Sequence, residues 1–291
     1  DLYQQARDKG YCITRSYKEY QKRSKKADKM ILLQSEEASK VDRGGIPYAL
    51  DRQEGDLTLP DITRAAINFL TKKQGGKDGF FLMVEGGKID WLCHANDVAF
   101  IPELIEMNDA VKVAFEFYQQ HPDETLIVVT ADHETGGLVL GRGGYQLNLQ
   151  AVANQRMSIS RLGTELHKLH DKYGDKYDWE VAKAFLTDNF GFWDKVQLSD
   201  DQTARLQRSF QRVLEGKGVD AKSLYQKDSE FAGTVNRVMS ECARLTWGTG
   251  SHTNGYVPCF SIGVGAELLQ GRLDNTELPL RMAKAAGWQV R

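Results

Sequence analysis

Carboxylate and imidazole side chains are concentrated in one short segment, "VEGGKIDWLCHAND", which covers residues 84 to 97. Asp90 and His94 are four residues apart, so on a helix both side chains lie on one face, within reach of one ion. An Asp oxygen and a His nitrogen are common zinc ligands, and Glu85 adds a second carboxylate just before the expected helix. Alone, the Asp-x-x-x-His spacing is a weak signal, because polar helix surfaces often contain it.

Two further segments carry side chains of the same kind. "LIVVTADHETGG" (126 to 137) is an apolar run that ends in the adjacent Asp132 and His133. "WGTGSHTNGYVPCFSIGVG" (247 to 265) places His252 in a glycine-rich loop before another apolar run. The paired glycines after His133 allow backbone to come close to a ligand. Each segment alone is compatible with a turn or cap residue, but the three together predict a metal site.

The elements that must position these residues are short apolar strands separated by helical patterns. A helical stripe is predicted over 61–73, and a second over 101–123, which Pro122 ends. This alternation indicates an α/β layered fold with a largely parallel sheet, whose sites gather beyond the carboxyl ends of the strands. Glu85 and Asp132 both stand close behind a predicted strand. The predicted strands are Tyr11–Thr14, Met30–Leu33, Phe80–Val84, Leu126–Thr130 and Val257–Val264.

Residues 145 to 246 interrupt this alternation with amphipathic, highly charged helical patterns and no convincing strand. We interpret the stretch as a helical insertion or cap within one α/β domain that spans residues 1–291.

Composition excludes several classes of function. The 38 basic and 40 acidic residues give a net charge of −2, so no bulk positive field recruits nucleic acid. No apolar run approaches the roughly 20 residues that span a bilayer. The four cysteines form no CxxC pair, which argues against a zinc knuckle or a thioredoxin-type site and leaves their pairing open. They are Cys12, Cys93, Cys242 and Cys259.

The three metal-type segments resemble, in this order, the metal-binding segments of alkaline phosphatases. "GGIPYALDR" (44 to 52) and "GAELLQGRLDNTEL" (265 to 278) are also similar to that family. The resemblance covers most of the chain outside 145–246, and it implies a three-layer α/β/α sandwich.

The resemblance also implies a role for each candidate residue. Asp90, His94 and His252 would bind a first Zn²⁺, and Asp132 and His133 would contribute to a second. Glu85 would be a ligand of one Mg²⁺, a hard ion that prefers oxygen donors. The implied reaction is hydrolysis of phosphate monoesters through a phosphoserine, which releases inorganic phosphate. A homodimer and a periplasmic or extracellular location are implied in the same way.

The chain departs from the family pattern at the nucleophile. The family uses a serine in an Asp-Ser-Ala motif, which these 291 residues lack, and its phosphate-binding arginine comes before the segments present here. Asp228–Ser229–Glu230 is the nearest string, but it follows no strand, so we reject it. We therefore expect the C-terminal portion of an alkaline phosphatase, with no catalytic residue of its own and little activity alone. An inactive metal-binding fragment, or a related phosphodiesterase or sulfatase, remains an alternative.

Overall fold

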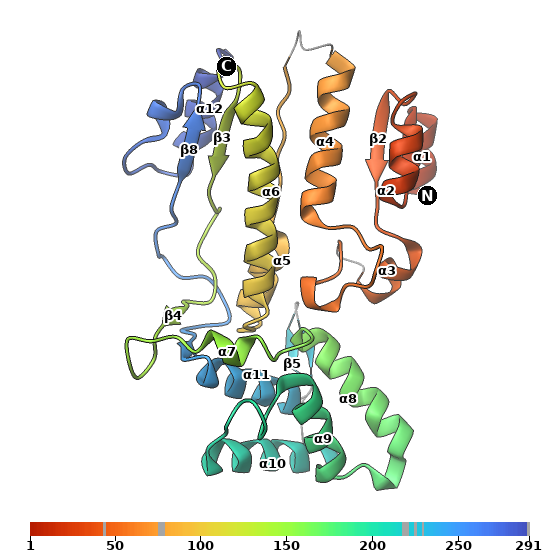
Figure 1. Cartoon of the computed structure of the whole chain (residues 1–291), viewed down its shortest axis with the longest axis vertical. Helices are drawn as coiled ribbons and strands as arrows, with labels where there is room; N and C mark the ends of the chain where they lie inside the picture. Colours follow the sequence, from red (N-terminus) through yellow and green to blue (C-terminus); the bar gives the residue numbers. More distant parts are fainter. Residues whose placement is uncertain (43–44, 75–78, 217–220, 224–225, 229, 290–291) are drawn as a thin grey trace.

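The computed structural model describes residues 1–42, 45–74, 79–216, 221–223, 226–228 and 230–289 (Figure 1). Gly44 and Ser229, named above, lie outside the described residues. Outside residues 145–246, the helices are α1 (Leu2–Asp8), α2 (Tyr17–Arg23), α3 (Glu36–Val41), α4 (Leu59–Gln74), α5 (Gly87–His94), α6 (Phe100–Gln120) and α12 (Glu277–Ala285). None of the described helices is long and apolar enough to cross a membrane.

The strands of the described residues lie in four two-stranded ladders, and one of these, β1–β2, is parallel. The other three, β3–β8, β4–β7 and β5–β6, are antiparallel. The strands are β1 (Tyr11–Thr14), β2 (Lys29–Leu32), β3 (Leu126–Val129), β4 (Val139–Leu140), β5 (Ala221–Ser223), β6 (Gln226–Asp228), β7 (Leu245–Thr246) and β8 (Phe260–Gly263). The predicted α/β class is confirmed, with less parallel pairing than expected. Parallel neighbours are usually joined by one crossover helix, whereas the chain between β3 and β8 contains many helices. Their connection therefore does not require these two strands to be parallel.

One predicted strand is wrong. Residues 79–86 form neither helix nor strand, although exposure alternates along 81–85 as it does in a strand. A strand also requires a neighbour that completes its ladder of hydrogen bonds, and no described strand pairs with this segment. Glu85 therefore follows a segment without sheet pairing. The predicted strands at 11–14, 30–33, 126–130 and 257–264 are confirmed, with shorter or shifted ends.

The antiparallel β3–β8 ladder brings two of the predicted metal-type segments together. Its register pairs Val129 with Phe260, so the residues that follow β3 lie beside those that precede β8. The loops 130–137 and 247–259 meet at this end of the ladder, and we call them the ligand loops. Figure 1 shows β3 and β8 side by side, with the chain of both loops continuing below them.

A group of helices at one end of the molecule, which we call the helical region (residues 149–242), has clear sequence signals for its ends (Figure 1). Ser158 and Asp178 cap α8 and α9 through their side chains, and Ser199 forms a capping box with Gln202 at α10. Gly191 ends α9 in the left-handed conformation at φ 68°. The helices are α7 (Leu149–Val152), α8 (Ile159–Tyr173), α9 (Trp179–Phe190), α10 (Asp200–Leu214) and α11 (Glu230–Cys242). The expectation that 145–246 contains no strand is wrong, because β5, β6 and β7 lie within it.

The main hydrophobic core joins the helical region to α5 and the start of α6. The largest fully buried side chains are Phe190, Phe192, Phe231, Leu92, Leu162, Leu186, Leu206, Met239, Leu245, Val98, Val235 and Val238. Leu92 lies on the same helix as Asp90 and His94, so packing in this core holds the helix that carries two candidate ligands. Burying side chains of this size stabilises by about 1.5–3 kcal/mol each.

Buried carboxylates at the joint between α5, α6 and the helical region satisfy backbone donors. Asp97 accepts hydrogen bonds from the backbone N–H groups of Ala99 and Ile159, at 2.9 and 2.7 Å, and from Gln155. Asp51, within the "GGIPYALDR" segment, accepts from the N–H and hydroxyl of Ser158. Both carboxylates therefore tie the start of α8 to the rest of the molecule.

Candidate metal centre

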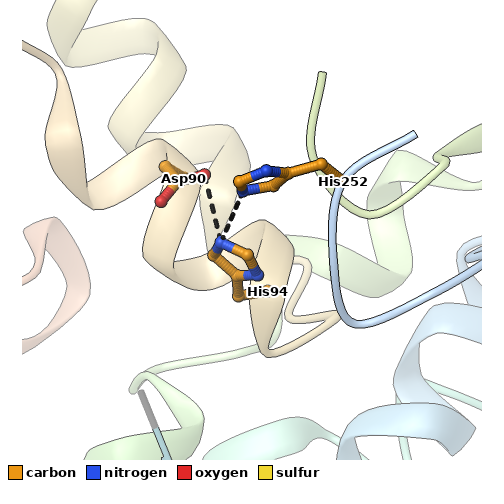
Figure 2. Close-up of side chains that lie close together, drawn as sticks. All are labelled: Asp90, His94 and His252. Carbon is orange, nitrogen blue, oxygen red and sulfur yellow. Dashed lines mark hydrogen bonds and ion pairs between the residues drawn. The ribbon is translucent and has the colours of Figure 1, made fainter. Parts of the chain in front are cut away.

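The structure brings Asp90, His94 and His252 together as one group that could hold a metal ion. Asp90 and His94 extend from one face of α5, as their spacing predicts, and His252 reaches them from the ligand loop 247–259 (Figure 2). One ligand atom from each of the three residues lies within 4.8 Å of the others. His94 and His252 are 158 positions apart in the sequence, so only the fold places them in contact.

Two distances define this group. The Nε2 atoms of His94 and His252 are 3.2 Å apart, and His94 Nε2 lies 3.5 Å from Asp90 Oδ1 (Figure 2). Asp90 and His94 are half-buried, whereas His252 is exposed. The group therefore combines two donors on a packed helix with one donor on an open loop.

The backbone fixes the orientation of the His94 ring. His94 Nδ1 lies 2.9 Å from the carbonyl oxygen of Gly250. A carbonyl oxygen only accepts, so Nδ1 carries the hydrogen, and in the neutral ring Nε2 presents its lone pair toward His252 and Asp90. This is the arrangement in which a metal-binding histidine has its second nitrogen engaged by a backbone acceptor.

Asp132 and His133 lie beside this group but are not part of it. The His133 ring stacks on the His252 ring with centroids 3.6 Å apart, and His133 Nε2 lies 3.3 Å from Asp132 Oδ2. The Asp132 side chain is 87% exposed. Within the described residues, no third His, Cys, Asp or Glu completes a group around these two donors. The pair can contribute to a second site, and further ligands are needed to complete it.

Glu85 lies apart from the other candidates. Its side chain is exposed and follows residues 79–84, whereas α5 begins at Gly87. In the part of the chain that the structure describes, the group of possible metal ligands comprises Asp90, His94 and His252, and Glu85 is not a member of it. The structure therefore places Glu85 next to α5 without bringing it into the three-residue group.

The two ligand loops are held together by Glu134. Its carboxylate accepts from the backbone N–H of Gly137 at 2.7 Å, from the N–H of Thr253 at 3.1 Å, and from the hydroxyl of Thr253. The hydrogen bond from the Thr253 hydroxyl is the largest cause of a lowered Glu134 pKa. Because Thr253 adjoins His252, this carboxylate ties the loop that carries His252 to the loop that carries His133.

Gly136 allows the loop 130–137 to press against α5. Its φ is +90°, a conformation that L side chains rarely adopt, and a Cβ there would lie 2.7 Å from the Trp247 ring and 3.0 Å from the Cys93 carbonyl oxygen. From the sequence, the paired glycines are expected to allow a close approach of the backbone to a ligand. The structure shows that Gly136 permits contact with Trp247 and with the helix that carries Asp90, and the approach to a ligand stays a prediction.

Cys93 is positioned as a core residue, between Asp90 and His94 in sequence. It is buried in the main hydrophobic core, and burial raises the pKa of its thiol to about 12. A thiol with so high a pKa is not a thiolate near neutral pH, and only the thiolate is a strong metal ligand. All four cysteines are free.

Two side chains that contact the candidate ligands or their loops are not among the residues predicted from the sequence. Glu134 connects the ligand loops, and the hydroxyl of Thr135 donates a hydrogen bond of 2.6 Å to Asp90 Oδ1. Both belong to the segment "DHETGG", directly after His133. Their proximity in sequence was a signal, but the identity of their partners depends on the contact between the loop and α5.

The family model described as alkaline phosphatase matches residues 1–288 of the chain. Alkaline phosphatase 3 of Bacillus subtilis (strain 168) is 31% identical over 250 residues, which cover 85% of this chain and 48% of that protein. Alkaline phosphatase 4 of the same organism is 28% identical over 236 residues, covering 80% of this chain and 44% of that protein. The chain thus spans about half the length of the curated relatives it matches.

A solved structure of similar fold is a cold-active alkaline phosphatase from a Shewanella species. It has a TM-score of 0.75 and 25% sequence identity, over 97% of this chain and 61% of that chain. The alkaline phosphatase of Thermus thermophilus has a TM-score of 0.72 at 25% identity, over 100% of this chain and 59% of that chain. Both likenesses extend through the helical region as well as the metal-type segments.

Proposed function

The chain belongs to the alkaline phosphatase family, and we propose that it supplies the metal-binding segments of an enzyme that hydrolyses phosphate monoesters. The observation that carries this proposal is the group of Asp90, His94 and His252, which comes from two distant segments and has the chemistry of a zinc site.

The measured distances support zinc at this group. With Zn–N bonds of about 2.0–2.1 Å, two corners of a tetrahedron lie about 3.3–3.4 Å apart. The separations of 3.2 Å and 3.5 Å from His94 Nε2 to its two neighbours bracket this value. Three protein ligands with an open fourth position are the pattern of a catalytic zinc site. We assign Asp90, His94 and His252 to the first Zn²⁺.

The remaining candidates are assigned to two further ions. Asp132 and His133 would contribute to a second Zn²⁺, which their position beside His252 supports. Glu85 would contribute an oxygen ligand to Mg²⁺, since a carboxylate suits a hard ion. Both assignments need ligands that the described residues do not provide, and for Glu85 the only support is the family pattern.

In the proposed reaction the residues of this chain hold and orient metal ions. A pair of zinc ions, when bound, stabilises both the attacking and the leaving oxygen of an in-line displacement at phosphorus. His94, held by Gly250, keeps its Nε2 lone pair directed at the first site, and the Glu134–Thr253 contact holds the loop of His252. The nucleophile would be a serine outside these 291 residues, which forms a phosphoserine that is then hydrolysed.

Assembly and location are proposed from the family alone. We propose a homodimer that acts in the periplasm or outside the cell, with phosphate monoesters as substrates and inorganic phosphate as product.

The test is the turnover of p-nitrophenyl phosphate by the whole enzyme that contains this chain. We expect activity that a chelator removes and that zinc plus magnesium restore. His252→Ala should lower kcat/KM by more than the about 10–100-fold that is typical of losing an outer-sphere partner. His167→Ala is the matched control, because that histidine is 78% exposed on α8 of the helical region.

Three outcomes would count against the proposal. Activity that survives complete chelation would exclude a metal-dependent reaction. A preference for bis-p-nitrophenyl phosphate would favour a phosphodiesterase. Robust zinc-dependent turnover by the 291-residue chain alone would contradict a nucleophile outside it, whereas zinc binding without turnover is the expected behaviour of the chain alone.

A further inference from the structure

The hydroxyl of Thr135 lies between the two candidate zinc sites. Its Oγ1 donates to Asp90 Oδ1 at 2.6 Å and lies 3.2 Å from His133 Nδ1. Asp90 is a proposed ligand of the first site and His133 of the second. One side chain that we do not assign as a ligand therefore touches a ligand of each site.

The direction of these hydrogen bonds follows from the chemistry of the groups. An ionised carboxylate only accepts, so the single O–H of Thr135 is given to Asp90. The Thr135 oxygen can then only accept from His133, and the other neighbour of His133 Nδ1 is the Glu134 carbonyl oxygen, 3.3 Å away. Both neighbours of Nδ1 are acceptors, which favours hydrogen on Nδ1. Asp132 Oδ2, beside Nε2, is an acceptor as well, so Thr135 and the Glu134 carbonyl favour hydrogen on Nδ1 in competition with Asp132.

The position of Thr135 is set by the backbone on either side of it. Glu134 ties this loop to Thr253, and Gly136 donates its N–H to the Ser251 carbonyl oxygen at 2.8 Å. The absence of a Cβ at Gly136 lets the loop approach Trp247 and the Cys93 carbonyl. These constraints bring Thr135 against α5, where it meets Asp90.

We propose that Thr135 is a positioning residue whose hydroxyl links the two zinc sites by orienting Asp90 and favouring hydrogen on Nδ1 of His133. This inference rests on the proposed function, because it assumes that Asp90 and His133 bind zinc. Loss of a hydrogen-bonded partner of a metal ligand typically weakens metal affinity 10–100-fold. Thr135→Val removes the hydroxyl and keeps the shape of the side chain, and Thr135→Ser retains the hydroxyl.

The first experiment measures zinc affinity of the chain by competition with a chromophoric chelator. We expect Thr135→Val to weaken binding about 10–100-fold and Thr135→Ser to bind nearly as the parent chain does. Thr130→Val is the matched control, since Thr130 follows β3 and its hydroxyl donates to the Pro258 carbonyl oxygen rather than to a proposed ligand. We expect Thr130→Val to bind zinc as the parent chain does.

The second experiment measures the tautomer populations of the His133 ring by ¹⁵N-edited NMR of the metal-free chain. The share of the Nδ1–H tautomer should be the same in the parent chain and in Thr135→Ser, and it should fall in Thr135→Val, which lacks the accepting oxygen. Unchanged zinc affinity or an unchanged tautomer in Thr135→Val would overturn the inference, as would failure of Thr135→Ser to restore binding. Failure of the parent chain to bind zinc would instead overturn the proposed function.

Discussion

The helical region and the β3–β8 ladder with its ligand loops differ in how deeply their apolar side chains are buried. Phe190 and Phe231, on α9 and α11, are 1% and 2% exposed, whereas Phe260 on β8 is 64% exposed. The helices share a continuous core with α5, but neither β3 nor β8 contributes a residue to that core. The proposed zinc ligands nevertheless lie on both sides of this division, with Asp90 and His94 on the packed helix and Asp132, His133 and His252 on the open loops.

The two regions therefore have different structural roles. The core around α11 holds α5, which carries Asp90 and His94, in place, while the ligand loops leave His252 and Asp132 exposed. Segments with few buried apolar contacts contribute little to global stability and open first. The ligand loops therefore depend on polar contacts, such as those of Glu134 and Thr135, to hold their donors in place.

The largest expected effect is on the free energy of unfolding, and it tests whether the helical region contributes more to stability than the β3–β8 ladder. Phe231→Ala should lower the free energy of unfolding by about 3–5 kcal/mol, because it leaves a cavity in the core. Phe260→Ala, on the open ladder, should change it by no more than about 0.5 kcal/mol. Urea unfolding followed by circular dichroism measures both values. Equal losses of unfolding free energy in the two variants would contradict the proposed difference between the two regions.

The next effect concerns the joint between the helical region and α6. Burial raises the pKa of Asp97 to about 6, above the ordinary value of 3.8, despite the hydrogen bonds that it accepts. Because the folded state binds this proton more tightly than the unfolded state, its contribution to stability is fully present below pH about 4. That contribution is lost as pH rises through about 6. A pKa difference of this size between the folded and unfolded states corresponds to on the order of 3 kcal/mol of stability.

Asp97→Asn removes this titration while keeping a side chain of the same shape. The free energy of unfolding, measured at intervals from pH 4 to pH 7, should fall more steeply with rising pH in the parent chain than in Asp97→Asn. Other carboxylates contribute equally to both proteins, so the difference between the two slopes isolates Asp97. Parallel curves would show that the joint does not bury an ionisable Asp97 in the manner described.

The smallest effects are expected in the ligand loops, and they depend on metal. In the presence of a chelator, His252→Ala should change the free energy of unfolding by no more than about 0.5 kcal/mol, because the side chain is exposed. Zinc at 100 times its Kd should stabilise the parent chain by about 2.7 kcal/mol, and His252→Ala should lose most of this gain. Thermal unfolding with and without zinc measures both. A metal-free loss as large as that of Phe231→Ala would place His252 among the core residues instead.

Much of the candidate site could be predicted from the sequence, because its residues lie in short segments with fixed internal spacing. The i, i+4 spacing of Asp90 and His94 determines a shared helix face wherever a helix forms, and α5 forms there. The apolar runs before Asp132 and after His252 identified β3 and β8. The boundaries 145 and 246 of the helical insertion remain a prediction, and the core that joins Leu92 to α11 crosses any such boundary.

Strand pairing is where local sequence signals failed. Residues 80–84 have the alternating exposure of a strand, yet no described strand pairs with them, and β3 pairs with β8 in the antiparallel sense. An apolar run indicates a segment that can be buried, whereas a ladder depends on which other segment the fold brings alongside.

The sequence by itself determined which side chains are candidate donors, the helix that carries Asp90 and His94, and the loops that carry Asp132, His133 and His252. These properties depend on spacing within about ten residues. Only the tertiary structure decided that His252 meets His94, because that contact joins residues 158 positions apart through the β3–β8 register. It also decided that Thr135 lies against Asp90, since this contact requires the loop to press against α5 at Gly136. Contacts between distant segments depend on the packing of the whole chain, which local spacing does not determine.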